Sequence, residues 1–397
     1  MCGYQRTKWG TTTLDRAVCV AEPMSTVTAF EPLVDVLIAV HDLRRPVERA
    51  VESVLQAASV PVRVTVVCHG IGTREMETRL AAFRGPELRV VSFSDGIFSP
   101  AGPFNHGIGL ATARYVSVLG SDDFFEPGAL DSWSRLAAAT NATAVLAPVR
   151  GPDARIIHSP LVRPSRRTAL DPVLDRLTYR SAPLGLIDRE WAQARQPFFT
   201  EGLVSGEDVN PSNELWFTAG SLAYASSSPA YGGGYDAVDR VTYTPMSMSA
   251  ELGAMFDLLG REWVNALGRR ERRALAIKVF RENLIESAVG KRRRMDDWGA
   301  GELDLVRDLA IRWARFAPGA VSVFSFTDRL LMDRLFDPLV REAEMVAAVV
   351  GWRGERSRVR RLLPRNPLRV FDRESAVRRM VDLEIALSRE RKASHDR

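Results

Sequence analysis

Short apolar runs that alternate with amphipathic segments dominate the first third of the chain. The run Val34–Val40 is rich in β-branched residues, which is typical of a strand buried on both faces of a parallel sheet. After it, Val47, Ala50 and Val54 fall on one helical stripe. The same pattern predicts strands at 62–68, 88–93, 115–120 and 143–147, and helices at about 46–55, 74–83, 103–112 and 128–139. Strands alternating with helices predict an α/β fold with a Rossmann-like, doubly wound and mostly parallel sheet.

Polar residues follow the predicted strands at the points where these strands end. They are His41, Asp42, His69, Asp95, Asp122 and Asp123. In a doubly wound sheet, ligands bind at the carboxyl ends of the strands, where the strand order reverses. We therefore expect these side chains to line a ligand site along one edge of the sheet.

Asp122 and Asp123 are adjacent carboxylates in the turn after the fourth strand, just before Pro127. A sugar diphosphate leaves poorly while its charge is uncompensated. Mn²⁺ or Mg²⁺ held by one or two carboxylates bridges phosphate oxygens and stabilises the departing group. The alternative is a structural one, in which one aspartate caps a helix and the other is solvated. The strand context favours the metal site.

A second acidic pair, Glu207–Asp208, lies between Gly206 and the polar-then-apolar stretch that starts at Asn210. Inverting sugar transfer needs a carboxylate that takes the proton of the acceptor hydroxyl as the new bond forms. Asp208 is the candidate base, and Glu207 is its neighbour or an acceptor contact. An acidic pair favoured by the dipole of a following helix is the structural alternative.

Several motifs, in order, resemble those of the family 2 glycosyltransferases, which have the GT-A fold and include enzymes of bacterial cell-surface polysaccharide synthesis. The similarity covers about residues 34–245. It rests on VLIAVHD (36–42), on SPAGPFNHGIGLATARYVSVLGSDDFFEPGAL (99–130) and on SGEDVNPSNELWF (205–217). The resemblance implies an inverting hexosyltransferase-like enzyme that moves a sugar from a nucleotide diphosphate sugar to a saccharide or lipid-linked acceptor.

The resemblance also implies residue roles. Asp123 would be the metal ligand, and Asp122 would contact the ribose or sugar and assist with the metal. His41, Asp42 and Asn105 would line the nucleotide pocket, and the strand pattern adds His69 and Asp95 as candidate donor contacts. Asp208 would be the base, Glu207 its partner, and Arg240 would approach the donor phosphates, although a structural ion pair explains Arg240 equally well. The run Tyr231–Tyr235 is a hypothetical closing segment.

Three positions depart from the family pattern. Gly120 stands where the family often has another aspartate, Phe104 replaces a frequent arginine, and Cys68–His69 replace an acidic pair that reads the nucleobase. These departures keep a second hypothesis open, in which the chain is a non-catalytic nucleotide-binding or scaffold protein on a degenerate GT-A fold.

The C-terminal part of the chain differs in composition. Residues 253–397 hold 31 Lys and Arg against 22 Asp and Glu. Helices are expected near 250–267, 270–288, 302–316, 325–350 and 372–392, with basic clusters at 269–273, 291–294 and 353–369. The arrangement predicts three regions: a disordered lead at 1–30, a GT-A catalytic domain at 31–250 and a basic helical region at 251–397. An anionic membrane contact and a dimer seam along 330–350 are hypotheses, and no nucleic-acid motif is present.

Cysteine usage and hydropathy predict the compartment. Cys2, Cys19 and Cys68 form neither a disulfide framework nor a zinc motif. No apolar run reaches the roughly 20 residues that cross a bilayer, and the start of the chain has no apolar core of a signal peptide. A cytoplasmic protein is therefore expected, with Met24 as an alternative start.

Overall fold

The main sheet contains every strand that the apolar runs predict. The computed structural model describes residues 30–164, 166–234 and 246–395. Its seven-stranded sheet has the order β3-β2-β1-β4-β8-β6-β9, in which β8 runs antiparallel to both of its neighbours. The strands are β1 (Val34–Val40), β2 (Val62–His69), β3 (Leu88–Phe93), β4 (Tyr115–Gly120), β6 (Ala144–Leu146), β8 (Gly185–Asp188) and β9 (Leu222–Tyr224).

Helices cover both faces of this sheet, as the alternating burial of β1 requires. Val36 and Ile38 pack into one apolar cluster with the buried stripe of α1 (Val47–Leu55), whereas Leu37 packs into a cluster on the other face. The remaining helices of this part are α2 (Thr73–Arg79), η1 (Ala81–Phe83), α3 (Ala101–Leu110) and α4 (Ala129–Thr140). The expected mostly parallel α/β architecture is confirmed.

A second, three-stranded sheet is not expected from the sequence. It joins β5 (Phe124–Phe125), β10 (Tyr231–Gly232) and β7 (Val149–Arg150). Since β10 pairs antiparallel with β5, it brings Tyr231 beside the turn that carries Asp122 and Asp123.

The sequence pattern predicts no strand or helix between 151 and about 250, but the structure has regular elements there. This stretch supplies β8 and β9 to the main sheet, together with η2 (Leu177–Tyr179), α5 (Arg189–Gln193) and α6 (Val209–Thr218). These strands are only three or four residues long, so they carry no recognisable hydrophobic period.

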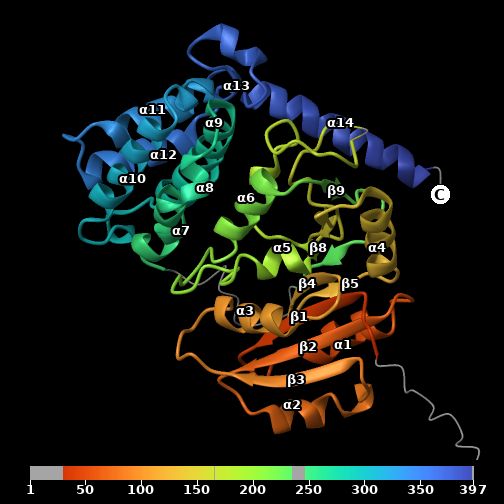
Figure 1. Ribbon diagram of the computed structural model, residues 1–397. Helices are drawn as coiled ribbons and strands as arrows, with labels where there is room; N and C mark the ends of the chain where they lie inside the picture. The colour runs from red at the N-terminus through yellow and green to blue at the C-terminus, as the bar shows by residue number, and fades with distance from the viewer. Residues whose placement is uncertain (1–29, 165, 235–245, 396–397) are drawn as a thin grey trace, which may run out of the picture. The chain divides into compact units, whose positions relative to one another are not determined.

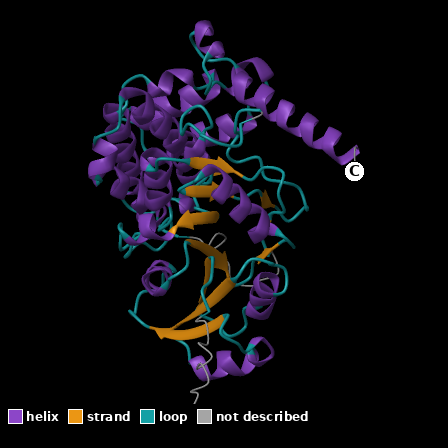
Figure 2. Ribbon diagram, turned by 45° about the vertical axis from the view of Figure 1, so that its right-hand side comes forward, coloured by secondary structure: helices purple, strands orange, loops and turns teal. Residues whose placement is uncertain are grey.

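The C-terminal helices gather beyond the β8–β9 end of the main sheet, away from β3 (Figure 1), and Figure 2 shows the same separation from another side. Phe280, Trp313 and Phe324 lie in their apolar core, which reaches Val209 of α6. The elements are α7 (Met248–Gly260), α8 (Glu262–Asn265), α9 (Arg269–Lys278), the π-helix η4 (Val279–Val289), η5 (Met295–Asp297), α10 (Glu302–Phe316), η6 (Ala320–Val323), α11 (Phe326–Phe336), α12 (Glu342–Gly354), α13 (Arg358–Leu362), η7 (Pro367–Phe371) and α14 (Ala376–His395).

The helix expected at 325–350 is two helices, α11 and α12, and this prediction is corrected. Pro338 lies in the connection between them, and a proline cannot donate to a helical ladder. The dimer seam stays a hypothesis. Within the described part of the chain, no helix is long and apolar enough to span a membrane.

Candidate active site

A pocket of about 430 Å³ opens where β1 and β4 end. The chain runs from β1 outward to β2 and β3 and then returns to β4 on the other side of β1, so the strand order reverses at this point. The lining residues are Ala39, Val40, His41, Arg45, His69, Phe98, Ser99, Pro100, Pro103, Phe104, Gly120, Ser121, Asp122, Val204 and Met246. The structure thus brings His41, His69 and Asp122 together, as the strand pattern predicts.

Two histidines and an exposed aromatic ring form one wall of the pocket. Phe98 is 75% exposed, and its ring meets that of His41 edge to face, with centroids 5.1 Å apart. Nε2 of His69 lies 2.8 Å from Oδ1 of Asp95. Burial alone would raise the pKa of Asp95, but hydrogen bonds from the Ile97 amide and from His69 outweigh it and lower that pKa. Asp95 therefore orients His69 instead of lining the pocket itself.

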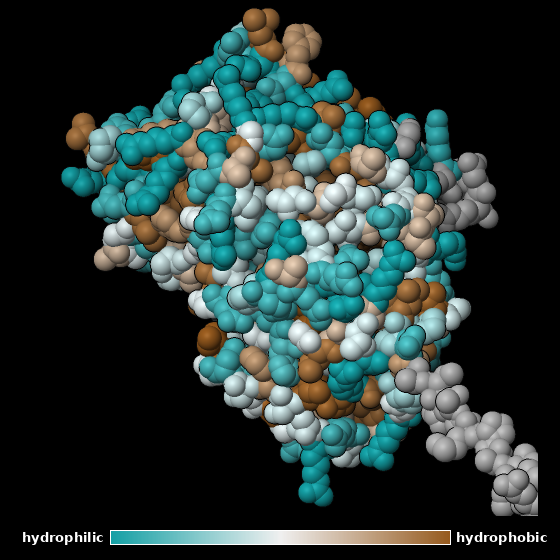
Figure 3. Space-filling model, viewed as in Figure 1, coloured by the Kyte–Doolittle hydropathy of each residue, from teal (hydrophilic) through white to brown (hydrophobic). Residues whose placement is uncertain are grey.

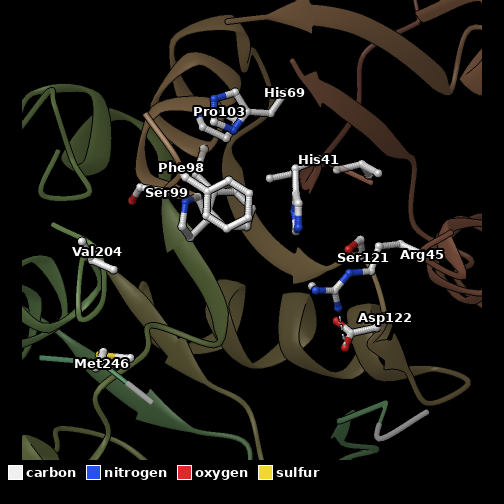
Figure 4. A pocket seen from close by; sticks show the side chains of 15 residues that line it. His41, Arg45, His69, Phe98, Ser99, Pro103, Ser121, Asp122, Val204 and Met246 are labelled. Carbon is white, nitrogen blue, oxygen red and sulfur yellow. Dashed lines mark ion pairs between the residues drawn. The ribbon is translucent and has the colours of Figure 1, made fainter. Parts of the chain in front are cut away.

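The opposite wall carries an ion pair that Figure 4 shows facing the same space as His41. Nη1 of Arg45 lies 3.2 Å from Oδ2 of Asp122, and each side chain is 11% exposed. The guanidinium of Arg49 donates to the backbone carbonyl of Asp122. Arg45 is a pocket residue that sequence reasoning missed, because the loop after β1 has no periodicity that would show which of its side chains turns inward.

Tyr231 of the second sheet and Gly234, just after that strand, orient the Asp123 carboxylate through hydrogen bonds. The Tyr231 hydroxyl donates to its Oδ2 at 2.6 Å, and the Gly234 amide donates to its Oδ1 at 2.9 Å. Burial, followed by the nearby Asp123 carboxylate, raises the pKa of Tyr231, so its hydroxyl stays protonated and donates. Tyr231 belongs to the run expected to close over substrate, but it is a buried strand residue, and Tyr235 lies outside the described residues.

Gly120 explains its own departure from the family pattern. A Cβ at this position would lie only 2.4 Å from Oδ2 of Asp123, so an aspartate at 120 would displace the neighbouring carboxylate. Among the described residues, no group of three or more His, Cys, Asp or Glu is placed to hold a metal ion. Asp122 and Asp123 nevertheless fit a Mg²⁺ or Mn²⁺ site that substrate phosphates complete. Metal-binding carboxylates are typically oriented by outer hydrogen bonds, as Asp123 is here.

Glu207 and Asp208 lie where α6 begins, but their side chains do not cap it. Asp208 occupies the N-cap position and makes no side-chain capping bond. Among the described residues, neither carboxylate makes an ion pair or a hydrogen bond to another side chain. Burial, followed by repulsion from Glu207, raises the pKa of Asp208 well above its usual range, and burial also raises the pKa of Glu207. The pair thus lies at the N-terminus of α6, where the structural alternative also expects it, but without a side-chain capping bond.

A buried cation, Lys278 of α9, lowers the pKa of Asp208 but does not offset these effects. The loop before the acidic pair borders the pocket through Val204, four residues upstream of Asp208. The acidic pair therefore flanks the cavity without lining it.

Two predicted donor contacts take other positions. Asp42 pairs with Arg44, whose guanidinium and amide hold the pKa of Asp42 well below its usual range. Asn105 is buried and binds both backbone groups of Phe199 and the Glu201 carboxylate, so it ties α3 to the loop before Asp208. Neither side chain lines the pocket. Arg240, like the lead at 1–29 with Met24, lies outside the described residues.

Comparison with known proteins agrees with this architecture. No family model matches the chain. A succinoglycan biosynthesis protein, ExoO of Rhizobium meliloti (strain 1021), is 35% identical over 101 residues, which are 25% of this chain and 28% of that protein. The crystal structure of S. aureus TarS 1–349 in complex with UDP-GlcNAc matches with a TM-score of 0.64 at 14% identity, over 80% of this chain and 90% of that one.

The complex of TarS 1–349 with UDP gives a TM-score of 0.60 at 14% identity, over 80% of this chain and 89% of that one. The expected GT-A fold is confirmed by these matches. The resemblance to family 2 glycosyltransferases of cell-surface polysaccharide synthesis is consistent with them at the level of the fold.

Proposed function

We propose that this GT-A chain is an inverting glycosyltransferase that uses a nucleotide diphosphate sugar. The observation that carries the proposal is that the site has two separate acidic pairs. A pocket at the point where the strand order reverses is lined by Asp122 of the first carboxylate pair, and the half-buried second pair, Glu207–Asp208, closely follows the lining residue Val204 in the chain. The TarS structures contain UDP-GlcNAc and UDP, which supports a nucleotide donor here.

Different residues of the pocket would bind different parts of the donor. The exposed Phe98 ring offers a surface for a nucleobase, with the His41 ring nearly perpendicular to it, and His69, oriented by Asp95, offers its second ring nitrogen to the base edge. Arg45 presents a guanidinium to the diphosphate, which such a group binds in a bidentate manner. When the donor binds, Asp122 would lose part of its contact with Arg45 and contact the donor instead.

The chemistry is a displacement at the anomeric carbon. The acceptor oxygen forms its bond to that carbon on the face opposite the diphosphate, the bond to the phosphate oxygen breaks, and the acceptor proton moves to Asp208. Its raised pKa makes Asp208 a stronger base than an ordinary aspartate. A Mn²⁺ or Mg²⁺ ion at Asp123 and Asp122 would neutralise charge on the leaving diphosphate. A saccharide or lipid-linked acceptor is the proposed partner.

A thermal-shift screen of UDP, GDP, TDP and CDP, each with and without Mn²⁺, tests the donor site. A ligand that binds only the folded state raises the melting temperature. We expect a shift with one nucleotide that grows with Mn²⁺ and is smaller in Arg45→Ala, whereas the neighbouring, exposed Arg44→Ala serves as the matched control. Donor binding without turnover on a panel of acceptors would instead favour the non-catalytic scaffold. No shift with any nucleotide in a folded protein would reject both.

A further inference from the structure

Residues 356–371, which lie within the connection between α12 and α14, combine dense positive charge with exposed apolar side chains. This segment contains α13 and η7, and we call it the basic tip. Its 16 residues include six arginines and no aspartate or glutamate. Carboxylates just outside the basic tip offset part of this charge, and the remaining positive charge attracts anionic partners.

Four large apolar side chains of the basic tip face solvent. Phe371 is 83% exposed, Leu368 is 76%, Val359 is 63% and Leu363 is 41%. Folding normally buries most residues of these types, and single exposed ones are common, but four within 13 residues form a patch. Figure 3 shows brown side chains projecting beside teal ones at the top of the view, where Figure 1 places α13.

The basic tip is nevertheless fixed to the helical core through its backbone. The Phe326 amide donates to the Leu363 carbonyl at 2.8 Å, and the Thr327 hydroxyl donates to the Arg360 carbonyl at 3.0 Å. The guanidinium groups of Arg360 and Arg365 lie over the Phe326 ring, 5.0 and 5.5 Å from its centroid. These contacts hold the backbone inward and leave the apolar tips outward.

The arginines of the basic tip fall into two sets. Arg360, Arg365 and Arg369 pair with carboxylates of the chain itself. Over the ranges that the structure describes, no ion pair engages Arg356, Arg358 or Arg361, and all three are exposed. The other basic clusters also contain arginines in internal ion pairs, such as Arg270 and Arg292, beside exposed ones such as Arg293, so the feature that sets the basic tip apart is its four exposed large apolar side chains.

We propose that the basic tip docks on an anionic lipid bilayer. Arg358 and Arg361 would bind lipid phosphates, while Leu368 and Phe371 enter the boundary between headgroups and acyl chains. Surfaces that combine basic side chains with aromatic or leucine side chains bind membranes in this way. Each arginine near an anionic surface adds to the binding affinity. The apolar side chains project between arginines. A lipid bilayer fits this arrangement because it is negatively charged at its surface and can deform around projecting groups. The inference goes beyond sugar transfer and does not depend on it.

Sedimentation of the full chain with vesicles tests the proposal, using phosphatidylcholine alone or mixed with phosphatidylglycerol. We expect binding only to the anionic vesicles, weakened by salt. Arg358→Gln with Arg361→Gln should weaken binding about 25-fold, at about fivefold per arginine. Leu368→Ser with Phe371→Ser should weaken it about tenfold or more even at high salt. Arg293→Gln and Leu339→Ser, both exposed elsewhere, are the matched controls and should change little.

Three results would overturn the proposal. The first is equal binding to neutral and anionic vesicles, or none to either. The second is binding that the control substitutions weaken as much as the basic-tip substitutions. The third is a larger species in light scattering that only the basic-tip substitutions dissociate, which would make this surface an interface between copies of the chain. Because the arginine and apolar pairs are tested separately, misfolding of one variant leaves the other to decide.

Discussion

The two acidic pairs of the candidate site have opposite surroundings. Asp122 and Asp123 are held by protein groups: Arg45 pairs with Asp122, and Tyr231 and Gly234 donate to Asp123. Glu207 and Asp208 are half-buried at the start of α6, where among the described residues neither makes a side-chain ion pair, and Lys278 only partly offsets the rise in the pKa of Asp208. The first pair is oriented by neighbouring groups, whereas burial and the adjacent like charge disfavour the charged form of the second pair.

This difference teaches how one chain obtains two roles from the same residue type. Donated hydrogen bonds and a guanidinium fix the orientation of a carboxylate, which suits the binding of a cation. Burial beside a like charge favours the protonated form, which suits a group that must accept a proton during the reaction. The substitutions below test whether the two pairs differ in this way.

The largest effect on turnover is expected when Asp208, the candidate base, is replaced. Asp208→Asn keeps the size of the side chain but cannot accept the acceptor proton, so kcat should fall about 10²–10⁴-fold. Nucleotide binding in the thermal-shift assay should stay within about twofold, since the acidic pair does not line the pocket. Glu214→Gln, on the same helix α6, is the control. Turnover close to that of the unaltered chain would remove Asp208 from the mechanism.

The next effect concerns the oriented pair. Asp123→Asn should abolish the part of the nucleotide-induced thermal shift that depends on Mn²⁺, while a smaller shift without metal remains through the pocket walls. The measurement is the melting temperature with UDP or the preferred nucleotide at increasing Mn²⁺. A Mn²⁺-dependent shift of undiminished size would mean that the metal, if bound, lies elsewhere.

A smaller effect should follow when the orienting group is removed instead of the carboxylate. Tyr231→Phe deletes the hydroxyl that donates to Asp123 and accepts from the Gly120 amide, and loss of such an outer partner weakens metal binding about 10- to 100-fold. The readout is the Mn²⁺ concentration that gives half of the nucleotide-dependent shift. Tyr224→Phe, a buried tyrosine of β9, is the control. Equal Mn²⁺ sensitivity in both variants would assign Tyr231 a packing role only.

The smallest expected effect is on stability. Because the folded-state pKa of Asp208 is raised, the native state binds more protons than the unfolded chain between about pH 4 and that raised pKa, so stability falls as pH rises through this window. Asp208→Asn should therefore raise the melting temperature by about 2 °C or more at alkaline pH, and the gain should vanish near pH 4. A gain that is constant with pH would attribute it to packing instead of charge.

Most of the α/β half could be predicted because its strands carry their own signal. The runs that form β1 and β4 are mostly apolar and buried on both faces, and the half-buried edge strand β3 still carries Leu88, Val90, Val91 and Phe93, so the bounds of all three match the expected ranges. β8 and β9 could not be predicted in this way, since they depend on pairing with β6 and β4 far along the chain. The break at Pro338 carried a local signal that periodicity over 325–350 obscured.

The candidate site was predictable only as far as strand ends determine it. His41, His69 and Asp122 meet in the pocket because parallel strands end at one edge. Which loop side chains turn inward was not predictable, so Arg45 and Phe98 were missed, while Asp42 and Asn105 have other partners. The roles of Asp122, Asp123, Glu207 and Asp208 stay predictions.

The hydrogen bond between Tyr231 and Asp123 also bears on the order in which the chain assembles. Its two residues are separated by 108 positions. During synthesis β1 to β4 emerge first and can pair early, whereas the residue that fixes Asp123 emerges much later. The nascent chain can therefore pair these four strands before its acidic turn has a fixed orientation, so the geometry of Asp123 is set late in folding.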